Sequence, residues 1–384
     1  DDVLEGRPIP FIALELDPDD ESMGTFAVTA EAKEALSKIE SPMAVVSVVG
    51  LYRTGKSFLL NRVLLDNPQA FPVGNTVNAC TKGLWIWSKP LRARSADGKV
   101  VNLLLIDTEG LGSLDANTQH DSCIFALSLL LSSFFIYNST GTISENAIEN
   151  LSLVVNLTKF IRVNSNEDGE EEDGKDFAAY FPQFLWVVRD FALQLTDEQG
   201  RPMSAREYLE KALQDVHGFT EKQLAKNRIR AMIRHFFPDR DCFPMVRPVE
   251  DEALLQRLDS QPEDVLRYEF VTQMHALRTL VSSNARPKTV QGRLVSGNML
   301  CLLAESYVKA MNEGSVPSIR DAWSCVCDRE CDRQADACVG MYEKEADTLR
   351  LTKLPLGHAE LHKWHTEREV DAMNTYQRST RTFQ

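Results

Sequence analysis

The chain has 384 residues, of which 43% are hydrophobic and 26% charged, a composition typical of an ordinary soluble protein. Because this length exceeds the usual size of a single domain, we expect two domains. The formal net charge of −14 argues against a general nucleic-acid binder, since contact with a phosphate backbone needs clustered lysine and arginine side chains.

The sequence shows no targeting or membrane-spanning signal. It begins with Asp1 rather than methionine and without a signal peptide, which is typical of a fragment. Its longest apolar segment, residues 123–137, contains three serines and is too short to span a bilayer. Residues 381–384 contain no C-a-a-X box for prenylation. We therefore expect a cytoplasmic protein with reduced thiols.

Residues 1–40 predict a lead-in that packs on the domain after it. An apolar segment at residues 11–14 precedes an acidic, turn-rich stretch at residues 17–20. A helix is expected from Thr29 to Ile39, with Thr29 as its N-cap.

Residues 43–57 contain the most specific motif of the chain. The uncharged, β-branched residues 43–49 predict a buried strand, which leads into G-x-x-x-x-G-K-S at residues 50–57. Apolar residues at helical spacing follow in residues 58–65. A phosphate-binding loop needs this strand, loop and helix, whereas a chance match in an ordinary turn would not.

The loop predicts a site for nucleotide phosphates and Mg²⁺. Gly50 and Gly55 allow the tight turn that points backbone N–H groups and the helix N-terminus at a phosphate. Lys56 then reaches the β- and γ-oxygens, and Ser57 is a ligand of Mg²⁺. Arg53 would lie beside the transferring phosphoryl group as an arginine finger, supplied by the chain itself or by a dimer mate; an ordinary surface arginine is the alternative.

A second Mg²⁺ ligand is expected in the polar segment at residues 73–83, which precedes an alternating strand at residues 84–87. In phosphate-loop proteins a threonine in a loop between the first helix and the second strand coordinates the ion. Thr81 is the candidate for this role.

A third motif follows the predicted strand at residues 100–106. Asp107, at the carboxyl end of this strand, is expected to hold Mg²⁺ through water, and Gly110 to donate its N–H to the γ-phosphate. The alternative is a plain strand-ending turn. This loop and the one at residues 73–83 would contact the γ-phosphate and lose these contacts after hydrolysis, which is how a nucleotide switch works.

The middle of the chain continues the alternation of strands and helices. The pattern predicts a helix at residues 120–131, a strand at 134–137 and an amphipathic helix at 144–160. The acidic segment at residues 164–176 breaks all periodicity and predicts a solvated, disordered loop.

A base-reading site is predicted where the strand at residues 184–188 delivers Arg189 and Asp190. The chain contains no Asn-Lys-x-Asp motif, so guanine, if it is read, must be read in another way. A carboxylate at the end of a core strand accepts hydrogen bonds from N1–H and the exocyclic amine of guanine and repels the adenine edge. Asp190 is therefore the candidate guanine reader.

The segments that follow complete the nucleotide domain. The pattern predicts helices at residues 204–214 and 220–235 and a strand at 242–246. The loop that begins with Arg247 and Pro248 is suited to covering a base.

The rest of the chain is almost wholly helical in pattern, and we expect no further strands. Helices are predicted at residues 263–283, 294–312, 316–348 and 356–384. The predicted fold is α/β, a mostly parallel phosphate-loop sheet flanked by helices, followed by an all-α helical domain. The expected domains are residues 1–310, the nucleotide domain, and residues 311–384, the start of the helical domain.

Clustered cysteines and histidines leave two metal-site alternatives open. Four cysteines within residues 325–338 have the spacing C-x-C-x3-C-x6-C rather than paired C-x2-C. Three of them, Cys327, Cys331 and Cys338, share a helix face, which favours a buried helix over a zinc site. Three histidines within residues 358–365 also share a face, where a solvated surface is favoured over a metal site.

Four motifs together resemble the guanylate-binding proteins, which are dynamin-related large GTPases, a group that also includes the atlastins. They are G-L-Y-R-T-G-K-S at residues 50–57, T-K-G at 81–83, D-T-E-G at 107–110 and R-D at 189–190. The similarity extends into the helical part and spans nearly the whole chain.

The resemblance implies GTP hydrolysis with Mg²⁺, homodimerisation through the G domains and a guanine cap around residues 247–262. It implies Arg53 as the catalytic arginine and Asp190 as the guanine reader. Some members of the family produce GMP as well as GDP. Members also continue into helical stalks beyond Gln384, so membrane association is expected only through missing C-terminal regions. Mammalian members usually carry a serine where this chain has Ala79, and Glu109 and backbone carbonyls are the expected substitutes in positioning water.

The predicted site residues fall into three groups. The catalytic candidates are Arg53, Lys56, Thr81 and Glu109. The nucleotide-binding candidates are Gly50, Tyr52, Arg53, Thr54, Gly55, Lys56, Ser57, Phe58, Gly110, Arg189, Asp190, Arg247 and Pro248. The metal candidates are Ser57, Thr81 and Asp107.

Two functions remain open at this point. In the first, the chain is a GTPase stimulated by dimerisation, acting in nucleotide-driven assembly. In the second, it is a nucleotide-gated scaffold that binds GTP and hydrolyses little, with Ala79 as the motivating feature. Arg53, Thr81 and Glu109 favour the enzyme.

Overall fold

The computed structural model describes residues 6–16, 24–40, 42–73, 82–94, 98–112, 118–153, 161–162, 180–218, 220–352 and 355–381. The chain divides into two compact units, Asp1–Ile319 and Arg320–Gln384. The domain boundary expected near residue 310 remains a prediction. The predicted disordered loop at residues 164–176 lies outside the described residues.

Within the described residues, nine strands form one mixed sheet in the first unit, in the order β2-β1-β4-β6-β3-β7-β8-β9, with β5 on β6. The strands are β1 (Pro8–Leu16), β2 (Gly24–Val28), β3 (Met43–Val49), β4 (Leu84–Trp87), β5 (Leu91–Arg94), β6 (Val100–Thr108), β7 (Phe134–Thr140), β8 (Gln183–Arg189) and β9 (Arg240–Pro244). The run from β6 through β3, β7 and β8 to β9 is parallel, and the other pairings are antiparallel. The predicted α/β fold is confirmed.

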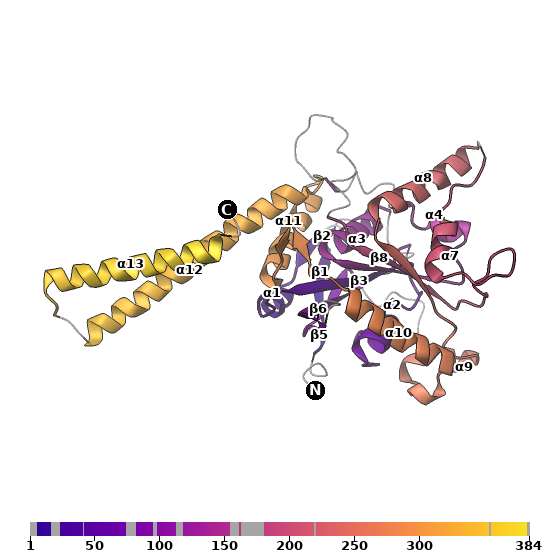
Figure 1. Ribbon diagram of the computed structural model, residues 1–384, viewed down its shortest axis with the longest axis horizontal. Helices are drawn as coiled ribbons and strands as arrows, with labels where there is room; N and C mark the ends of the chain where they lie inside the picture. Colours follow the sequence, from indigo (N-terminus) through magenta and orange to yellow (C-terminus); the bar gives the residue numbers. More distant parts are fainter. Residues whose placement is uncertain are drawn as a thin grey trace. The chain divides into compact units, whose positions relative to one another are not determined.

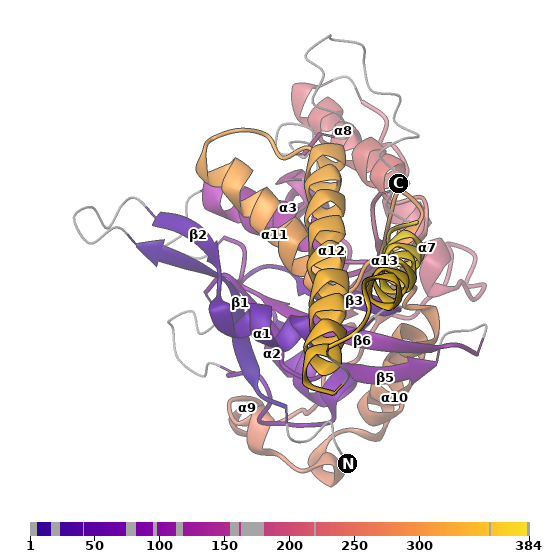
Figure 2. The same cartoon turned by 90° about the vertical axis from the view of Figure 1, so that its left-hand side faces the viewer.

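Helices cover both faces of this sheet (Figure 1 and Figure 2). One face carries α1 (Ala30–Ser37), α3 (Thr118–Leu131) and α11 (Gly297–Asn312). The other carries α2 (Lys56–Leu59), its π-helical continuation η2 (Leu60–Leu65) and α10 (Tyr268–Asn284). The other described helices of the first unit are α4 (Glu145–Glu149), α7 (Ala205–Ala212), α8 (Glu221–Phe236), α9 (Glu252–Leu255), η4 (Leu258–Ser260) and η5 (Glu263–Val265).

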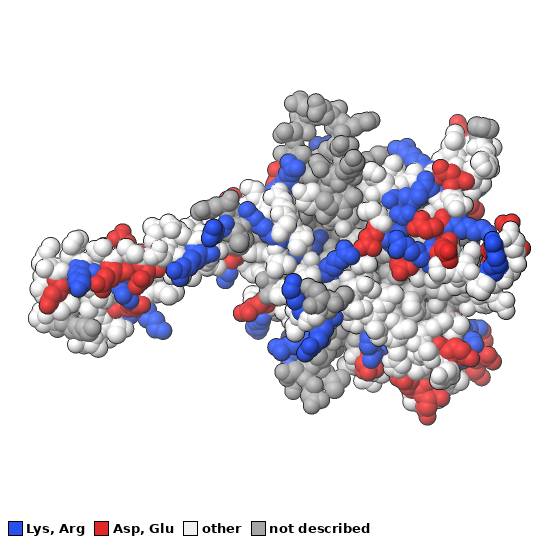
Figure 3. Space-filling model, viewed as in Figure 1, with Lys and Arg blue, Asp and Glu red and all other residues white. Residues whose placement is uncertain are grey.

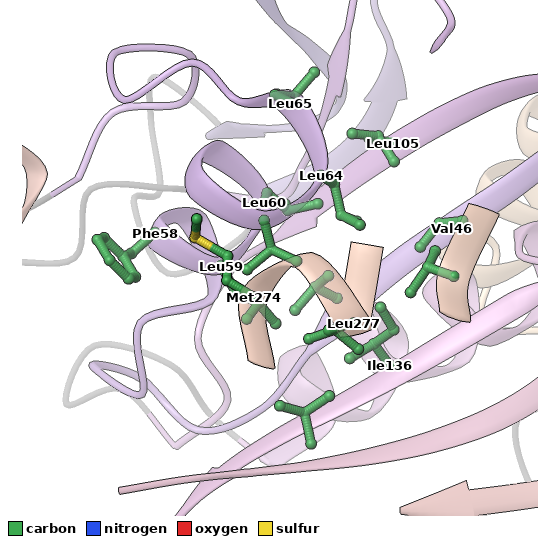
Figure 4. Close-up of a cluster of buried hydrophobic side chains, with 14 of the residues drawn as sticks. Val46, Phe58, Leu59, Leu60, Leu64, Leu65, Leu105, Ile136, Met274 and Leu277 are labelled. Atoms are coloured by element: carbon green, nitrogen blue, oxygen red, sulfur yellow. The ribbon is translucent and has the colours of Figure 1, made fainter. Parts of the chain in front are cut away.

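The phosphate-loop helix is held by a buried apolar cluster (Figure 4). Phe58 and Leu60, from α2 and η2, pack with Met274 and Leu277 of α10 against the sheet. The sheet contributes alternate residues such as Val46, because successive side chains of a strand point to opposite faces. All seven residues of β3 are buried, so the strand before the loop is fixed from both sides.

The helical part consists of α12 (Ile319–Thr352) and α13 (His358–Thr380). Within the second unit, Tyr342 Oη lies 2.7 Å from His365 Nδ1, and Arg368 pairs with Glu345 at 3.2 Å. Among the residues that the structure describes, no cluster of three metal-ligating side chains occurs, and no helix is long and apolar enough to cross a membrane.

The structure contains strands that the sequence pattern did not predict, near both ends of the first unit. The predicted lead-in contains helix α1 with Thr29 as its N-cap, as expected, but before it the chain forms strands β1 and β2, and β1 pairs with both β2 and β4. The expectation of no strands after residue 263 is wrong. Strands β10 (Thr289–Val290) and β11 (Arg293–Leu294), of two residues each, pair as an antiparallel hairpin. Its turn residues, Gln291 and Gly292, have φ of 51° and 76°, as a type I′ turn requires.

The helix predicted at residues 144–160 is also shorter than expected. Helix α4 begins after the N-cap Ser144 and ends at Glu149, with Asn150 as its C-cap. Residues 154–160 lie outside the described part of the chain.

Acidic and basic side chains are interspersed over α7 and α8 (Figure 3). Ion pairs join Arg230 to Glu145, Arg234 to Asp215 and Arg240 to Glu210. Such a surface lacks the single sign of charge that a nucleic-acid backbone needs.

Candidate functional site

The loop between β3 and α2 has the backbone of a phosphate site. Gly55 is the N-cap of α2 and has φ of 78°, in the left-handed region that favours glycine. The loop is supported from β7, because Asn138 Nδ2 donates to Thr54 O at 2.8 Å. The chain therefore turns directly into the positive end of a helix, where backbone N–H groups are available to an anion.

Arg189, at the end of β8, lies behind this loop. Its side chain is buried, donates from Nη1 to Gly55 O at 3.2 Å and lies 5.2 Å from the ring centroid of Phe58. Burial lowers the pKa of Arg189, and the charge of Asp190 opposes this effect. The structure thus assigns Arg189 a contact with the loop backbone, and Asn138 is a second support that the motifs alone did not reveal.

Lys56 is buried at the start of α2, and its Nζ donates to Leu51 O at 3.1 Å. Burial lowers its pKa to about 8, while the charges of Asp107 and Glu109 act in the opposite direction. A buried ammonium that bonds to one carbonyl of its own loop keeps further N–H donors for a phosphate.

Ser57 and Asp107, the two metal candidates within the described residues, contact each other. Ser57 Oγ donates to Asp107 Oδ2 at 2.7 Å, and Asp107 is fully buried at the end of β6. A hydroxyl and a carboxylate oxygen are hard donors that Mg²⁺ prefers, so this pair fits the ion. Thr81 lies outside the described residues.

The segment after β6 is joined to the phosphate loop by its backbone. Leu111 N donates to Gly50 O at 3.1 Å, and Tyr52 N donates to Leu111 O at 3.0 Å. A Cβ at Gly110 would lie 2.4 Å from Tyr52 Cα, so only glycine allows this approach. The structure therefore brings the two predicted loops together.

Glu109 connects this segment to the residues before β4. Its Oε2 accepts from Gly83 N at 2.8 Å and lies 3.0 Å from His120 Nε2. Burial raises the pKa of Glu109, but the hydrogen bonds from His120 and Gly83 outweigh it and leave the pKa lowered. The hydrogen bond to Glu109 raises the pKa of His120.

Arg53 and Asp190 are exposed and have unusual backbones. Their φ angles are 62° and 55°, in the left-handed region, which few non-glycine residues adopt. Such strained conformations concentrate at functional sites.

The segment that begins with Arg247 and Pro248 is ordered by its own contacts. Arg247 Nη2 donates to Glu252 Oε1 at 2.7 Å, and Pro248 O accepts from Arg267 N at 2.9 Å. Arg62 of η2 donates to backbone carbonyls farther along, including Asp259 O at 2.9 Å. The helix that starts at the phosphate loop therefore also holds this segment, which sequence spacing alone did not indicate.

Comparison with known proteins agrees with the resemblance that the four motifs carry. The family model described as "Guanylate-binding protein, N-terminal domain" matches residues 23–290, and "Guanylate-binding protein, C-terminal domain" matches residues 291–382. Guanylate-binding protein 7 of Mus musculus is 41% identical over 353 residues, covering 91% of this chain and 54% of the relative. Guanylate-binding protein 1 of Chlorocebus aethiops is 39% identical over 361 residues, covering 93% of this chain and 60% of the relative.

The chain spans about half the length of the curated relatives it matches. The resemblance seen in the four motifs is nevertheless confirmed by matches that together cover residues 23–382. The chain belongs to the guanylate-binding protein family.

Proposed function

We propose that the chain binds GTP with Mg²⁺ and hydrolyses it to GDP and phosphate. The observation that carries this proposal is the convergence of buried Lys56 with the Ser57–Asp107 pair, 2.7 Å apart, at the start of α2. Family membership supports the choice of a guanine nucleotide, since the family is described as guanylate-binding.

The binding step rests on charge and backbone geometry. Lys56 and the N–H groups of the loop hold the β- and γ-phosphates, and Asp190 accepts hydrogen bonds from guanine. Ser57 and Asp107, with Thr81, would hold Mg²⁺, which supplies positive charge to the phosphate oxygens when bound. The segment at residues 247–262 covers the base.

In the hydrolytic step, a water oxygen forms a bond to the γ-phosphorus while the bond to the β–γ bridging oxygen breaks. GDP leaves, and the proton of the water passes to the phosphate that is released. Arg53 stabilises the charge that spreads over the γ-oxygens, and Glu109 orients the water. Tyr52 and Arg53 are exposed on the loop, which supports dimerisation across the nucleotide face.

A single-turnover assay tests the proposal. Protein in excess over GTP should convert it to GDP, with the fraction of GMP measured in the same samples. Lys56→Ala should lose nucleotide binding and keep its fold, because no apolar core contact is removed. Normal GTP affinity in that variant would remove the phosphate-loop assignment, and binding without turnover in the wild type would favour the scaffold.

A further inference from the structure

His120 has a direct contact with the candidate site that none of the four motifs predicts. Its Nε2 lies 3.0 Å from Glu109 Oε2, the oxygen that also accepts from Gly83 N. The side chains of His120 and Glu109 are 14% and 11% exposed, so water competes weakly for either group. Two donors on one carboxylate oxygen fix the direction in which that carboxylate points.

The ring of His120 is itself held in place. It stacks on Phe26 of β2 with ring centroids 5.4 Å apart and an interplanar angle of 24°. Phe26 is bonded at both backbone groups by Asn312 of α11, at 3.0 Å through its N and 2.8 Å through its O. Packing against Phe26 therefore fixes the position of the imidazole that contacts Glu109.

The neighbouring residue of α3 strengthens the same attachment. Asp121 Oδ2 accepts from Gly112 N at 2.7 Å, so the first turns of α3 contact the segment after β6 at two points. Glu109 is additionally bonded through its own N–H to Gly83 O at 2.9 Å. Loss of the imidazole would leave Glu109 with the Gly83 contacts but without the one that fixes it to α3.

We propose that His120 is a positioning residue that holds Glu109 on Gly83 and so fixes the segment after β6 to the segment before β4. This inference rests on the proposed function for its effect on turnover. Its structural part concerns only the hydrogen bond between Glu109 and the Gly83 amide.

Two variants of His120 separate the hydrogen bond from packing. His120→Leu keeps much of the volume beside Phe26 but removes the donor, whereas His120→Gln places an amide N–H donor at a similar reach. We expect kcat to fall about tenfold in His120→Leu with little change in KM, and to recover in His120→Gln.

A double-mutant cycle with Glu109→Gln identifies the route of the effect. If His120 acts through Glu109, adding His120→Leu to Glu109→Gln lowers kcat no further. Additive losses would show that His120 has a separate, structural role and would overturn the proposal.

Hydrogen exchange in the nucleotide-free protein tests the geometry without any turnover. The Gly83 amide should exchange about tenfold faster in His120→Leu and return towards the wild-type rate in His120→Gln, while amides of α10 stay unchanged. Unchanged exchange at Gly83 would overturn the proposal even if the wild type hydrolyses GTP. Faster exchange at Gly83 in His120→Leu, together with a wild type that does not hydrolyse GTP, would instead leave the positioning role standing and refute the proposed function.

Discussion

Asp190 tests base recognition at the scale of a single residue. It is exposed and has φ of 55°, a conformation that asparagine also tolerates, so Asp190→Asn should leave the backbone unchanged. The amide offers one acceptor where the carboxylate takes two donors from guanine, so we expect GTP affinity to fall by roughly 2–4 kcal/mol. Calorimetry of wild type and variant with GTP and ATP measures this loss. Equal binding of GTP and ATP by the wild type would exclude Asp190 as the base reader.

The Glu109–His120 pair predicts a pH dependence of stability. The pKa of His120 is raised above its ordinary 6.5, so its contribution is complete below about 6.5 and is lost as pH rises through the raised pKa. The pKa of Glu109 is lowered below 4.5, so its contribution is lost only as pH falls through that lowered value. Asp121 on the same helix also raises the pKa of His120, and Lys82 lowers that of Glu109.

We therefore expect His120→Leu to lose more unfolding free energy at pH 6 than at pH 8.5. Denaturant titrations of both proteins at the two pH values measure the difference. Asp121 and Lys82 are present in both proteins, so their own titration largely cancels. A loss that is the same at both pH values would mean that the imidazole contributes packing rather than charge.

Sequence reasoning singled out residues that lie in short motifs. Ser57 follows β3 and Asp107 lies near the end of β6, and because these strands are adjacent and parallel the two side chains are 2.7 Å apart. Their role in holding Mg²⁺ stays a prediction. Asn138 was missed as a site residue because its partner Thr54 is 84 residues away in the sequence. His120 was missed because its partner Glu109 is 11 residues away and outside its own helix, a spacing that none of the four motifs spans. No local pattern encodes such contacts.

At the scale of elements, long apolar runs predicted strands well. β3 and β8 were found because they are buried throughout most of their length, which leaves continuous runs of apolar residues. β5 was missed because its sequence, Leu-Arg-Ala-Arg, is short and half charged. β10 and β11 have two residues each, too few to show any periodicity.

The missed hairpin adjoins a buried lysine that joins three elements. Lys288, directly before β10, donates from Nζ to Leu130 O at 2.7 Å and Ser132 O at 2.8 Å, at the end of α3. Its backbone N donates to Met43 O at 2.7 Å at the start of β3. Burial lowers the pKa of Lys288 to about 7.

Lys288→Met should destabilise the first unit, because the carbonyls of Leu130 and Ser132 lose a buried partner. The expected loss of unfolding free energy is about 1–3 kcal/mol, measured by chemical denaturation. Lys309→Met is the matched control, since its side chain is 75% exposed and its ion pair with Glu313 is long at 3.9 Å. The control should change stability by less than about 0.5 kcal/mol. Equal losses in both variants would show that the Lys288 bonds contribute nothing net.

At the scale of the whole molecule, the fold class followed from the alternation of strands and helices, but the sheet order did not. β1 and β2 were expected only as a lead-in, because pairing of β1 with β4 joins residues far apart in sequence. The motifs were sufficient for the family because each keeps its chemistry in a short stretch. The structure then shows which residues, distant in the sequence, contact these motifs.

Dimerisation through the phosphate-loop face is the prediction that concerns the whole molecule. Tyr52 is 41% exposed, and Arg53 beside it is also exposed, so both are available to a second copy. In the proposed mechanism the loop backbone and Lys56 supply ground-state binding, whereas Arg53 acts on charge that develops in the transition state.

Specific GTPase activity of the wild type should therefore rise with protein concentration, and sedimentation should show a dimer with a non-hydrolysable GTP analogue. Arg53→Ala should bind GTP almost normally by calorimetry, yet kcat should fall at least about a hundredfold and stay flat with concentration, because arginine fingers contribute about 10³–10⁵ in rate. Equal rates in wild type and variant would remove Arg53 from the mechanism. A wild-type activity independent of concentration, with Arg53→Ala still slow, would keep the arginine but place its action within one chain.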